Sequence, residues 1–328
     1  MKTKKLGRTD LHLSVIGLGA WAMGGGNYIA GWGAQDDNES ISTIKHALDL
    51  GINWIDTAPV YGFGHSETVV GKALVGIRGK AVIATKCSRV WDPSGKISGN
   101  LKKDNLRREI EASLKRLNTD YIDLYQIHWP DPAQDIEEAW TVVNGFIKEG
   151  KVRYGGVSNF SIKQMRRIAL LGKIASAQPP YNMIKRSVED GLLEYCSAED
   201  IGVIVYSPMQ AGLLTGKFSK ERVDGLPADD WRKTSSYFND PELGANLDLV
   251  EGLKGIIAGR DWTLSQFAIA WTLRRREVTS AIVGARNPAQ IEEAALAAGK
   301  ALAGEDISQI ETLLDARKYD LRKRAQEI

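Results

Sequence analysis

Two kinds of segment alternate regularly along this chain. Short apolar runs bounded by turn residues are each followed by a longer segment whose apolar residues recur at helical spacing. Continuous apolar runs of this kind are typical of parallel strands that are buried on both faces. The predicted strands are Val15–Trp21, Ile52–Ile55, Ala81–Thr85, Tyr121–Ile127, Val152–Val157, Ile174–Ala177, Ile201–Val205 and Thr279–Val283. Eight strand–helix units predict an α/β fold, a closed (β/α)8 TIM barrel.

Some segments lie outside this repeat. Residues Lys4–Ser14 alternate around a turn and predict an N-terminal β-hairpin. Helical patterns over about 243–259 and 306–317 predict two extra helices that decorate the barrel. The irregular stretch from Ser207 to about Pro241 is too long for a simple connection, and we expect it to help form a pocket. Because no linker interrupts the alternation, we expect a single domain over residues 1–328.

Three helices carry recognisable start signals. Ser161 with Gln164, and Asp135 with Glu138, match the capping-box pattern, in which each side chain bonds the other residue's backbone N–H. Asn287-Pro288 offers a good N-cap followed by proline at the first helical position. These signals predict helices that begin directly after each cap.

Composition narrows the functional classes. The 328 residues carry 43 basic and 41 acidic side chains, a formal net charge of +2, which gives no support to nucleic-acid binding. No run approaches the about 18 apolar residues of a membrane helix, and no apolar segment follows the basic N-terminus as in a signal peptide. The two cysteines, Cys87 and Cys196, favour a reducing cytoplasm over a disulfide framework. We expect no metal site, and the pattern carries no signal for the oligomeric state.

Polar residues that suit proton transfer follow three consecutive predicted strands. Asp56 and Tyr61 follow the second strand, Lys86 ends the third, and His128 ends the fourth. In a barrel these strand ends converge on one face, so the four side chains can meet. A lysine ammonium beside the phenol is expected to lower its pKa, and a buried lysine needs a carboxylate partner. The set predicts a catalytic site in which Tyr61 protonates a carbonyl oxygen, and His128 holds that oxygen or aids proton transfer.

Each of these residues also has an ordinary structural interpretation. Asp56 alone could cap a turn, Lys86 alone could be solvated at a strand end, and His128 alone could be a structural histidine. Their shared position at adjacent strand ends favours the catalytic interpretation. Cys87 has no activating partner in the sequence and is expected to be inert.

A second set of polar residues follows the later strands. Ser158 and Asn159 end the fifth strand and Gln178 ends the sixth, where they could hydrogen-bond a carboxamide. Tyr206 ends the seventh strand and could present its face to a ring, although a tyrosine there could also be a core residue. The segment that begins at Ser207 and the charge of Lys217 would suit a pyrophosphate.

One motif points to a different fold. Gly17-x-Gly19-x-x-Ala22 matches the phosphate-binding fingerprint of Rossmann domains. The acidic residue expected about 20 positions later is not at the end of the next strand. We therefore interpret these glycines as barrel-rim backbone.

With these residues in view, the sequence resembles an aldo-keto reductase along its whole length, and within that superfamily the bacterial branch of general-stress and glycerol dehydrogenase-like members. The matching motifs are GLGAW from Gly17, IDTAPVYG from Ile55, ATK ending at Lys86, QIHWPDP around His128, GVSNF from Gly156, YSPMQAGLLTGK from Tyr206 and GARNPAQIEE from Gly284. Together these motifs are highly specific.

The resemblance implies a role for each matched residue. It implies that Asp56, Tyr61, Lys86 and His128 are the catalytic tetrad. It also implies that the nicotinamide amide is held by Ser158, Asn159 and Gln178, that Tyr206 stacks on the nicotinamide ring, that Ser207, Met209 and Lys217 contact the pyrophosphate, and that Trp21 and Trp129 line the substrate pocket. The chain departs from the common pattern at Met209, at Ala294 and in lacking a lysine just after strand eight.

The segment after the eighth strand bears on the cofactor. Arg286 stands before a helix start capped by Asn287, and both a guanidinium and a helix N-terminus favour an anion. Because the resemblance places the adenosine end of the cofactor here, we predict NADP(H) over NAD(H). Gly284, Gln290 and Glu293 complete this predicted cofactor site. The alternative is that Arg286 points into water.

The predicted function is that of an NAD(P)H-dependent carbonyl reductase acting on small aldehydes, ketones or polyols. A first alternative is a sensor or regulatory protein that keeps the cofactor but turns over slowly, like the potassium-channel β subunits. A second is a barrel enzyme that uses Lys86 as a Schiff base, against which the pairing of Lys86 with Asp56 argues. Trp32 and Trp91 are expected near the substrate pocket without a defined place.

Overall fold

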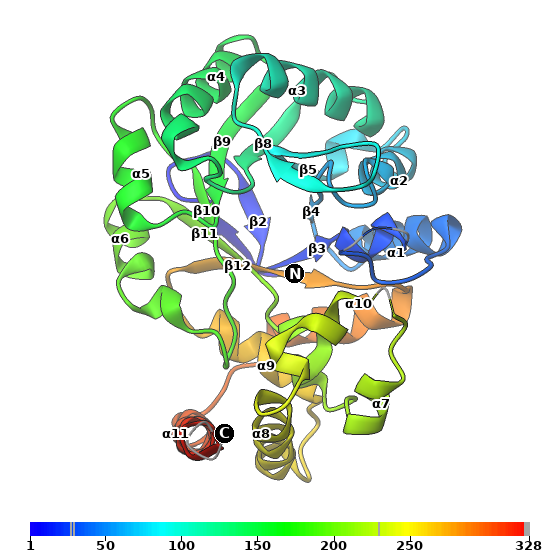
Figure 1. Ribbon diagram of the computed structural model, residues 1–328, viewed down its shortest axis with the longest axis vertical. Helices are drawn as coiled ribbons and strands as arrows, with labels where there is room; N and C mark the ends of the chain where they lie inside the picture. Colours follow the sequence, from blue (N-terminus) through cyan, green and yellow to red (C-terminus); the bar gives the residue numbers. More distant parts are fainter. Residues whose placement is uncertain (27, 29, 229, 325–328) are drawn as a thin grey trace.

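Eight parallel strands close into a barrel in the computed structural model, which describes residues 1–26, 28, 30–228 and 230–324 (Figure 1). The strands follow one another around the barrel in chain order, and the last pairs with the first. They are β3 (Ile16–Gly19), β4 (Trp54–Asp56), β5 (Val82–Cys87), β8 (Ile122–Ile127), β9 (Val152–Ser158), β10 (Ser176–Gln178), β11 (Gly202–Tyr206) and β12 (Val278–Gly284). The prediction of a closed parallel barrel is confirmed.

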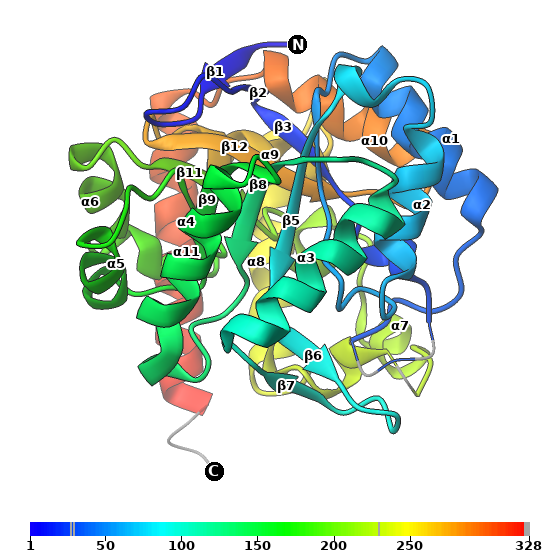
Figure 2. The same ribbon diagram turned by 90° about the horizontal axis from the view of Figure 1, so that it is seen from above.

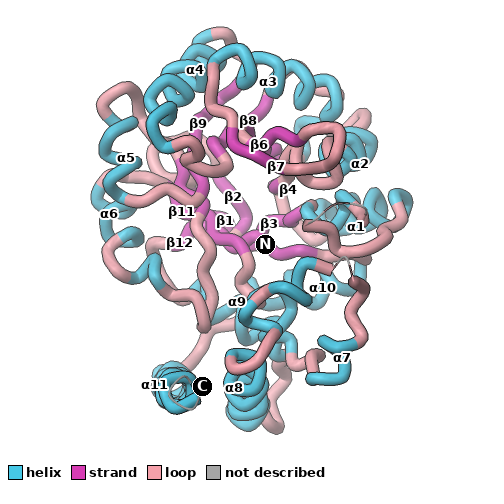
Figure 3. The backbone as a smooth tube through the Cα atoms, viewed as in Figure 1, coloured by secondary structure: helices cyan, strands magenta, loops and turns pink. Residues whose placement is uncertain are grey.

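A helix follows each barrel strand, and together these helices surround the barrel (Figure 3). They are α1 (Asp37–Asp49), α2 (His65–Ala73), α3 (Lys103–Leu117), α4 (Ile136–Lys148), α5 (Ile162–Ala169), α6 (Leu192–Ala198), α9 (Leu264–Leu273) and α10 (Pro288–Ala295). Their apolar faces pack on the outer side of the strands, as Trp140, Val143 and Phe146 of α4 show with side chains that are completely buried. The helical spacing of apolar residues in the sequence thus corresponds to the buried faces.

The two predicted extra helices are present outside this ring. They are α8 (Glu242–Ile257) and α11 (Gly304–Arg324), which lie side by side in Figure 1 and contact each other. Arg317 of α11 donates a hydrogen bond of 2.6 Å to the side chain of Asn246 in α8. The last helix extends seven residues beyond its predicted end at residue 317.

The N-terminal hairpin closes one end of the barrel (Figure 2). It consists of β1 (Thr3–Lys5) and β2 (His12–Ser14), and Leu6 and Leu13 pack into the barrel interior against Trp54. Gly17 makes room for this arrangement, because a Cβ atom at that position would lie 2.0 Å from the Trp54 ring. The Gly17 motif therefore serves interior packing, and the barrel topology excludes its Rossmann interpretation.

Two of the predicted helix starts have the expected hydrogen bonds. Ser161 and Gln164 form a capping box, and the Asn287 side chain accepts from the backbone N–H of Gln290, with Pro288 at the helix start. The capping box predicted for Asp135 and Glu138 is wrong. Asp135 precedes α4, but its carboxylate binds the ammonium group of Lys102 at 2.8 Å and caps nothing.

The opposite end of the barrel carries loops that the sequence pattern did not predict in detail. A second hairpin, β6 (Arg89–Trp91) and β7 (Ile97–Gly99), follows β5, and a short helix, α7 (Lys220–Asp224), lies in the long segment after Ser207. Figure 2 shows both far from the β1–β2 hairpin. In the described part of the chain, no helix has the length and apolar character needed to cross a membrane.

Candidate active site

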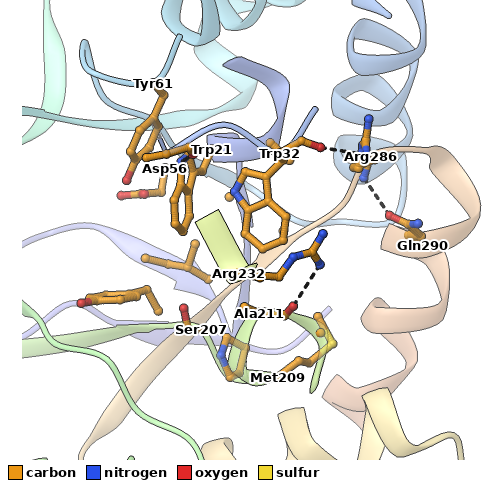
Figure 4. A pocket seen from close by; sticks show the side chains of 18 of the residues that line it. Trp21, Trp32, Asp56, Tyr61, Ser207, Met209, Ala211, Arg232, Arg286 and Gln290 are labelled. Atoms are coloured by element: carbon orange, nitrogen blue, oxygen red, sulfur yellow. Dashed lines mark hydrogen bonds between the residues drawn. The ribbon is translucent and has the colours of Figure 1, made fainter. Parts of the chain in front are cut away.

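A cavity of about 630 Å³ opens at the carboxyl ends of the barrel strands (Figure 4). All the predicted site residues line it except Lys86, which is completely buried behind Asp56 and Tyr61. The long segment after Ser207 contributes part of the wall, which confirms its predicted part in a pocket. Among the described residues, no group of three or more His, Cys, Asp or Glu side chains could hold a metal ion.

Lys86 joins Asp56 and Tyr61 into one hydrogen-bonded unit. Its ammonium group donates to Asp56 Oδ2 at 2.7 Å, to the backbone carbonyl of Thr57 at 3.0 Å and to Tyr61 Oη at 3.2 Å. Strand register explains the meeting, since Asp56 pairs with Ala84 and Lys86 lies one side-chain repeat further along β5. Because Tyr61 Oη accepts from Lys86, its own hydroxyl hydrogen is left for another partner.

The pKa of Tyr61 differs from expectation. We expected Lys86 to lower it, but burial and the Asp56 carboxylate hold the pKa of Tyr61 well above 10. The physical reason is that Asp56 balances the charge of Lys86, while burial disfavours the phenolate. Burial likewise lowers the pKa of Lys86, an effect that Asp56 opposes. The phenol therefore keeps its proton at neutral pH, as a proton donor requires.

His128 faces Tyr61 from the end of β8. The two rings meet edge to face with centroids 5.9 Å apart. Burial, together with the positive charges of Lys86 and Arg89, holds the pKa of His128 well below 6.5. The imidazole is therefore neutral at neutral pH, which makes it suited to donating a hydrogen bond to a carbonyl oxygen rather than a proton.

The residues predicted to hold a carboxamide form a connected network. Gln178 donates to Asp56 Oδ1 at 2.8 Å, and Ser158 donates to the backbone carbonyl of Gln178 at 2.9 Å. Asn159, which has a positive φ of 62°, donates to the backbone carbonyl of His128 and accepts from the Tyr206 hydroxyl at 2.9 Å. Strained backbone of this kind is typical of functional sites.

The backbone after β11 forms a concave turn at the cavity wall. Ser207, Gln210, Ala211 and Gly212 all have positive φ values, between 46° and 91°. Turns of this type can direct backbone N–H groups toward an anion. Lys217 is mostly exposed, with its ammonium 4.0 Å from the Glu293 carboxylate. That Ser207, Met209 and Lys217 contact a pyrophosphate stays a prediction, with which these positive φ values are compatible.

Arg286 lines the cavity and also holds the loop of residues 30–35 (Figure 4). Its guanidinium donates to the backbone carbonyls of Trp32 and Ala34 and to Gln35 Oε1. The backbone N–H of Arg286 donates to Gln290 Oε1 at 2.8 Å. Arg286 therefore does not point into water, but only part of its donor set remains for a ligand.

An aromatic cluster lies beside Tyr61, and of its three tryptophans only Trp231 had no predicted role, since Trp21 was predicted to line the substrate pocket and Trp32 to lie near it. Trp21 stacks on Tyr61 and on Trp231, with centroids 5.9 Å and 5.6 Å away, and meets Trp32 edge to face. Figure 4 shows Trp21 between Tyr61 and Trp32. The Arg232 guanidinium lies 4.8 Å from the centroid of Trp32. The sequence signal was a tryptophan in each of two long loops, but no periodic pattern fixes the position of such residues.

Trp129 lines the cavity as predicted, whereas Trp91, which was expected near the substrate pocket, is not one of the lining residues. Trp129 is 39% exposed, with the Arg89 guanidinium over its ring. Trp91, from the β6–β7 hairpin, stacks on Phe63 at 5.1 Å. Arg89 also lines the cavity, and the sequence analysis missed it although it follows Lys86 by only three residues.

Comparisons with known proteins agree with this geometry. Residues 15–315 match the model of the aldo/keto reductase family. The chain is 39% identical to the aldo-keto reductase YhdN of Bacillus subtilis, over 96% of this chain and 94% of that protein. It is 35% identical to the NADH-specific methylglyoxal reductase of Escherichia coli, over 96% and 99% of the two chains.

Among solved structures, the glycerol dehydrogenase AKR11B4 from Gluconobacter oxydans superposes with a TM-score of 0.87 at 36% identity, covering 96% of this chain and 95% of that one. The family model, the relatives and the fold all agree with the motifs found in the sequence. The chain belongs to the aldo/keto reductase family, whose members are oxidoreductases that act on carbonyl groups with nicotinamide cofactors.

Proposed function

We propose that this protein reduces small aldehydes or ketones to alcohols with a reduced nicotinamide cofactor, and that Tyr61 supplies the proton. The observation that carries the proposal is the buried ammonium of Lys86, which contacts Asp56 and Tyr61 beside a cavity. The neutral imidazole of His128 lies against the same phenol. A charged pair, a protonated phenol and a neutral N–H donor together suit proton delivery to a carbonyl oxygen.

Each polar residue of the site has its own role in the proposed reaction. A bound reduced nicotinamide cofactor supplies the hydride that reaches the carbonyl carbon. His128 and Tyr61 hold the carbonyl oxygen by hydrogen bonds, and the Tyr61 hydroxyl transfers its proton to that oxygen. The phenolate that forms on Tyr61 is stabilised by Lys86, whose ammonium already donates to Tyr61 Oη. Asp56 fixes that ammonium and balances its charge while no phenolate is present.

The cavity also fits the cofactor itself. Ser158, Asn159 and Gln178 would hold the nicotinamide amide, and the ring of Tyr206 would lie against the nicotinamide. The turn of positive-φ residues that includes Ser207, together with Met209 and Lys217, would take the pyrophosphate. Gly284, Arg286, Gln290 and Glu293 would surround the adenosine end.

We further propose that NADPH is preferred over NADH. The support is Arg286, a guanidinium at the start of α10, where the free N–H groups of the helix also favour a phosphate. Two facts argue against a preference for NADPH. A relative from Escherichia coli is named as NADH-specific, and Arg286 already bonds the loop of residues 30–35. The Arg286 variant described in the Discussion tests the preference.

The proposed compartment is the cytoplasm. Both cysteines, Cys87 and Cys196, are buried as free thiols, and burial raises the pKa of each, so neither is a reactive thiolate at neutral pH.

A substrate screen tests the proposed function directly. Purified protein is mixed with aldehydes, ketones and polyols, and the absorbance of NADH and NADPH is followed in both reaction directions. Cofactor-dependent reduction of at least one carbonyl class is the expected outcome. Retention of tightly bound cofactor with turnover slower than about one per minute on every compound would instead favour a sensor, since enzymes in general typically turn over at about 1–10³ s⁻¹.

A further inference from the structure

Arg89 is a cavity-lining cation whose guanidinium is largely unused. It begins β6, and its side chain lies over the ring of Trp129 at 5.5 Å. One of its five N–H groups donates to Asp131 Oδ2 at 2.8 Å, and the structure shows no other hydrogen bond of this side chain within the described residues. The Asp131 side chain is 55% exposed at the surface, whereas that of Arg89 is only 22% exposed. A mostly covered guanidinium that lines the cavity therefore keeps donors for a further acceptor.

The backbone around Arg89 is held firmly. Ser88, the preceding residue, has a positive φ of 81°, and its N–H donates to Glu109 Oε2 of α3 at 3.0 Å. The Ser88 carbonyl accepts from Asn100 at 2.9 Å, and the Ser88 hydroxyl bonds the backbone of Trp129. An unfavourable conformation fixed by three elements of the fold indicates that the direction of Arg89 is built in.

Arg89 is separate from Lys217 and Arg286, the two cations proposed to bind the cofactor. Lys217 comes from the segment after β11, as do the cavity-lining Arg222 and Arg232, and Arg286 follows β12. Arg89 follows β5, three strands beyond β12 around the barrel. Arg89 is close enough to His128 for its charge to act on that imidazole. The Arg89 guanidinium also lies over the ring of Trp129, the residue after His128, so it is near one of the two side chains proposed to hold the carbonyl oxygen.

We propose that Arg89 binds a carboxylate on the substrate, so that the enzyme favours oxo acids over neutral aldehydes of the same length. The inference rests on the proposed carbonyl reduction at Tyr61. A guanidinium binds a carboxylate through two parallel N–H groups, and Arg89 already binds one carboxylate, that of Asp131. Asp131, exposed to water, can release Arg89 at little cost when a substrate carboxylate enters.

The test compares two matched series, ω-oxo acids and n-alkanals of three to six carbons, in the wild type and in Arg89→Gln and Arg89→Lys. The readout is the ratio of kcat/KM for the acid to kcat/KM for the aldehyde at each length. We expect the wild-type ratio to be at least about ten at the best length, because one hydrogen bond between charged groups changes kcat/KM by at least about that factor. Arg89→Gln should bring the ratio to about one, and Arg89→Lys should restore part of it.

Arg222→Gln is the matched control. Arg222 lines the cavity in the segment after β11, where the pyrophosphate is proposed to bind. Its loss should change kcat/KM for acids and aldehydes equally and leave their ratio unchanged. A wild-type ratio of one or less at every length, or a wild-type ratio retained in Arg89→Gln, would overturn this inference alone. If neither series is reduced while the wider screen finds another carbonyl substrate, this inference alone fails. If the wider screen finds no substrate with NADH or NADPH, the proposed function fails, and this inference fails with it.

Discussion

Gln178 donates a hydrogen bond of 2.8 Å to Asp56 across the barrel, from β10 to the directly opposite strand β4. The bond reaches Oδ1, while Lys86 binds Oδ2 of the same carboxylate. A residue proposed to hold the nicotinamide therefore also fixes the carboxylate that binds Lys86. In the proposed mechanism, cofactor binding and proton transfer would share Asp56, which is 4% exposed.

Replacing Gln178 should accordingly affect both functions. Gln178→Leu should raise the Kd for the cofactor and also lower the rate of the chemical step, because Asp56 loses a hydrogen bond inside the protein. Ser158→Ala is the comparison, since Ser158 bonds the backbone of Gln178 and not Asp56, and it should change the cofactor Kd alone. Cofactor titration and single-turnover kinetics measure the two effects. A chemical step unchanged in Gln178→Leu would show that the bond to Asp56 has no catalytic role.

Tyr61→Phe should reduce turnover by at least about 10²-fold, the usual effect of losing an acid catalyst, while the cofactor Kd stays nearly constant. The contrasting variant is Tyr206→Phe, which removes the hydroxyl that bonds Asn159 and should act mainly on cofactor binding. Steady-state rates and fluorescence titration with NADPH check the pair. Retention of most of the turnover in Tyr61→Phe, with chemistry rate-limiting, would remove Tyr61 from the mechanism.

Asp56 and Lys86 should behave as one unit in a double-mutant cycle. Asp56→Asn leaves the buried ammonium without its balancing charge, and Lys86→Met leaves Tyr61 without its cationic neighbour. Each change should impair kcat, and the double variant should lose less than the sum of the two losses in activation free energy. Thermal unfolding of each variant shows whether it is folded. Strictly additive losses would mean that the two side chains act independently.

If Arg286 binds the adenosine 2′-phosphate, Arg286→Ala should lower kcat/KM for NADPH more than kcat/KM for NADH. The difference should correspond to about 1.5–3 kcal/mol in activation free energy. The matched control is Gln35→Ala, which removes a loop-side partner of Arg286 but keeps the guanidinium. That control should shift both cofactors equally, because it disturbs only the loop. The measurement is kcat/KM for both cofactors in each protein. A wild-type preference for NADH, or equal losses in Arg286→Ala, contradicts the NADPH proposal.

The stability of the protein should depend on pH through Glu109. Burial, together with the negative charge of Glu67, raises the pKa of Glu109 from 4.5 to about 8. Hydrogen bonds from the Ser88 N–H and the Asn105 side chain, and the positive charge of Arg116, oppose this rise. Between these pH values the folded state holds a proton that the unfolded state has released, so the free energy of unfolding falls as pH rises. The loss by about pH 8 is on the order of a few kcal/mol.

Glu109→Gln removes this titration and should therefore gain stability over the wild type as pH rises from about 5 to about 8. Glu111→Gln, on the exposed side of the same helix, is the control. Its difference from the wild type in free energy of unfolding should change much less between the two pH values. Denaturant unfolding at both pH values gives the comparison. A Glu109→Gln difference that stays constant with pH would disprove the raised pKa.

The barrel and the grouping of polar residues at its strand ends could be predicted from the sequence. Apolar runs and helical spacing are local patterns, and each one depends only on which face a segment buries. Once the strands are parallel and in order, Asp56, Lys86 and His128 must end on the same face, so their proximity needs no further information. The Asn287 and Ser161 caps were predictable for the same reason, since a cap involves only neighbours three residues away.

The arrangement of the loops and the balance of the charges depend on contacts between residues that are distant in the sequence. The capping box at Asp135 failed because Lys102, 33 residues away, competes for the carboxylate. The pKa of Tyr61 is raised because burial and Asp56 outweigh Lys86, a balance that depends on three-dimensional distances and solvent exclusion. The Trp21–Trp32–Trp231 cluster and the place of Arg89 likewise depend on non-periodic loops that meet only when the barrel closes. The spacing of apolar residues depends only on which face of one segment is buried. It therefore cannot predict which distant segments will line the same cavity.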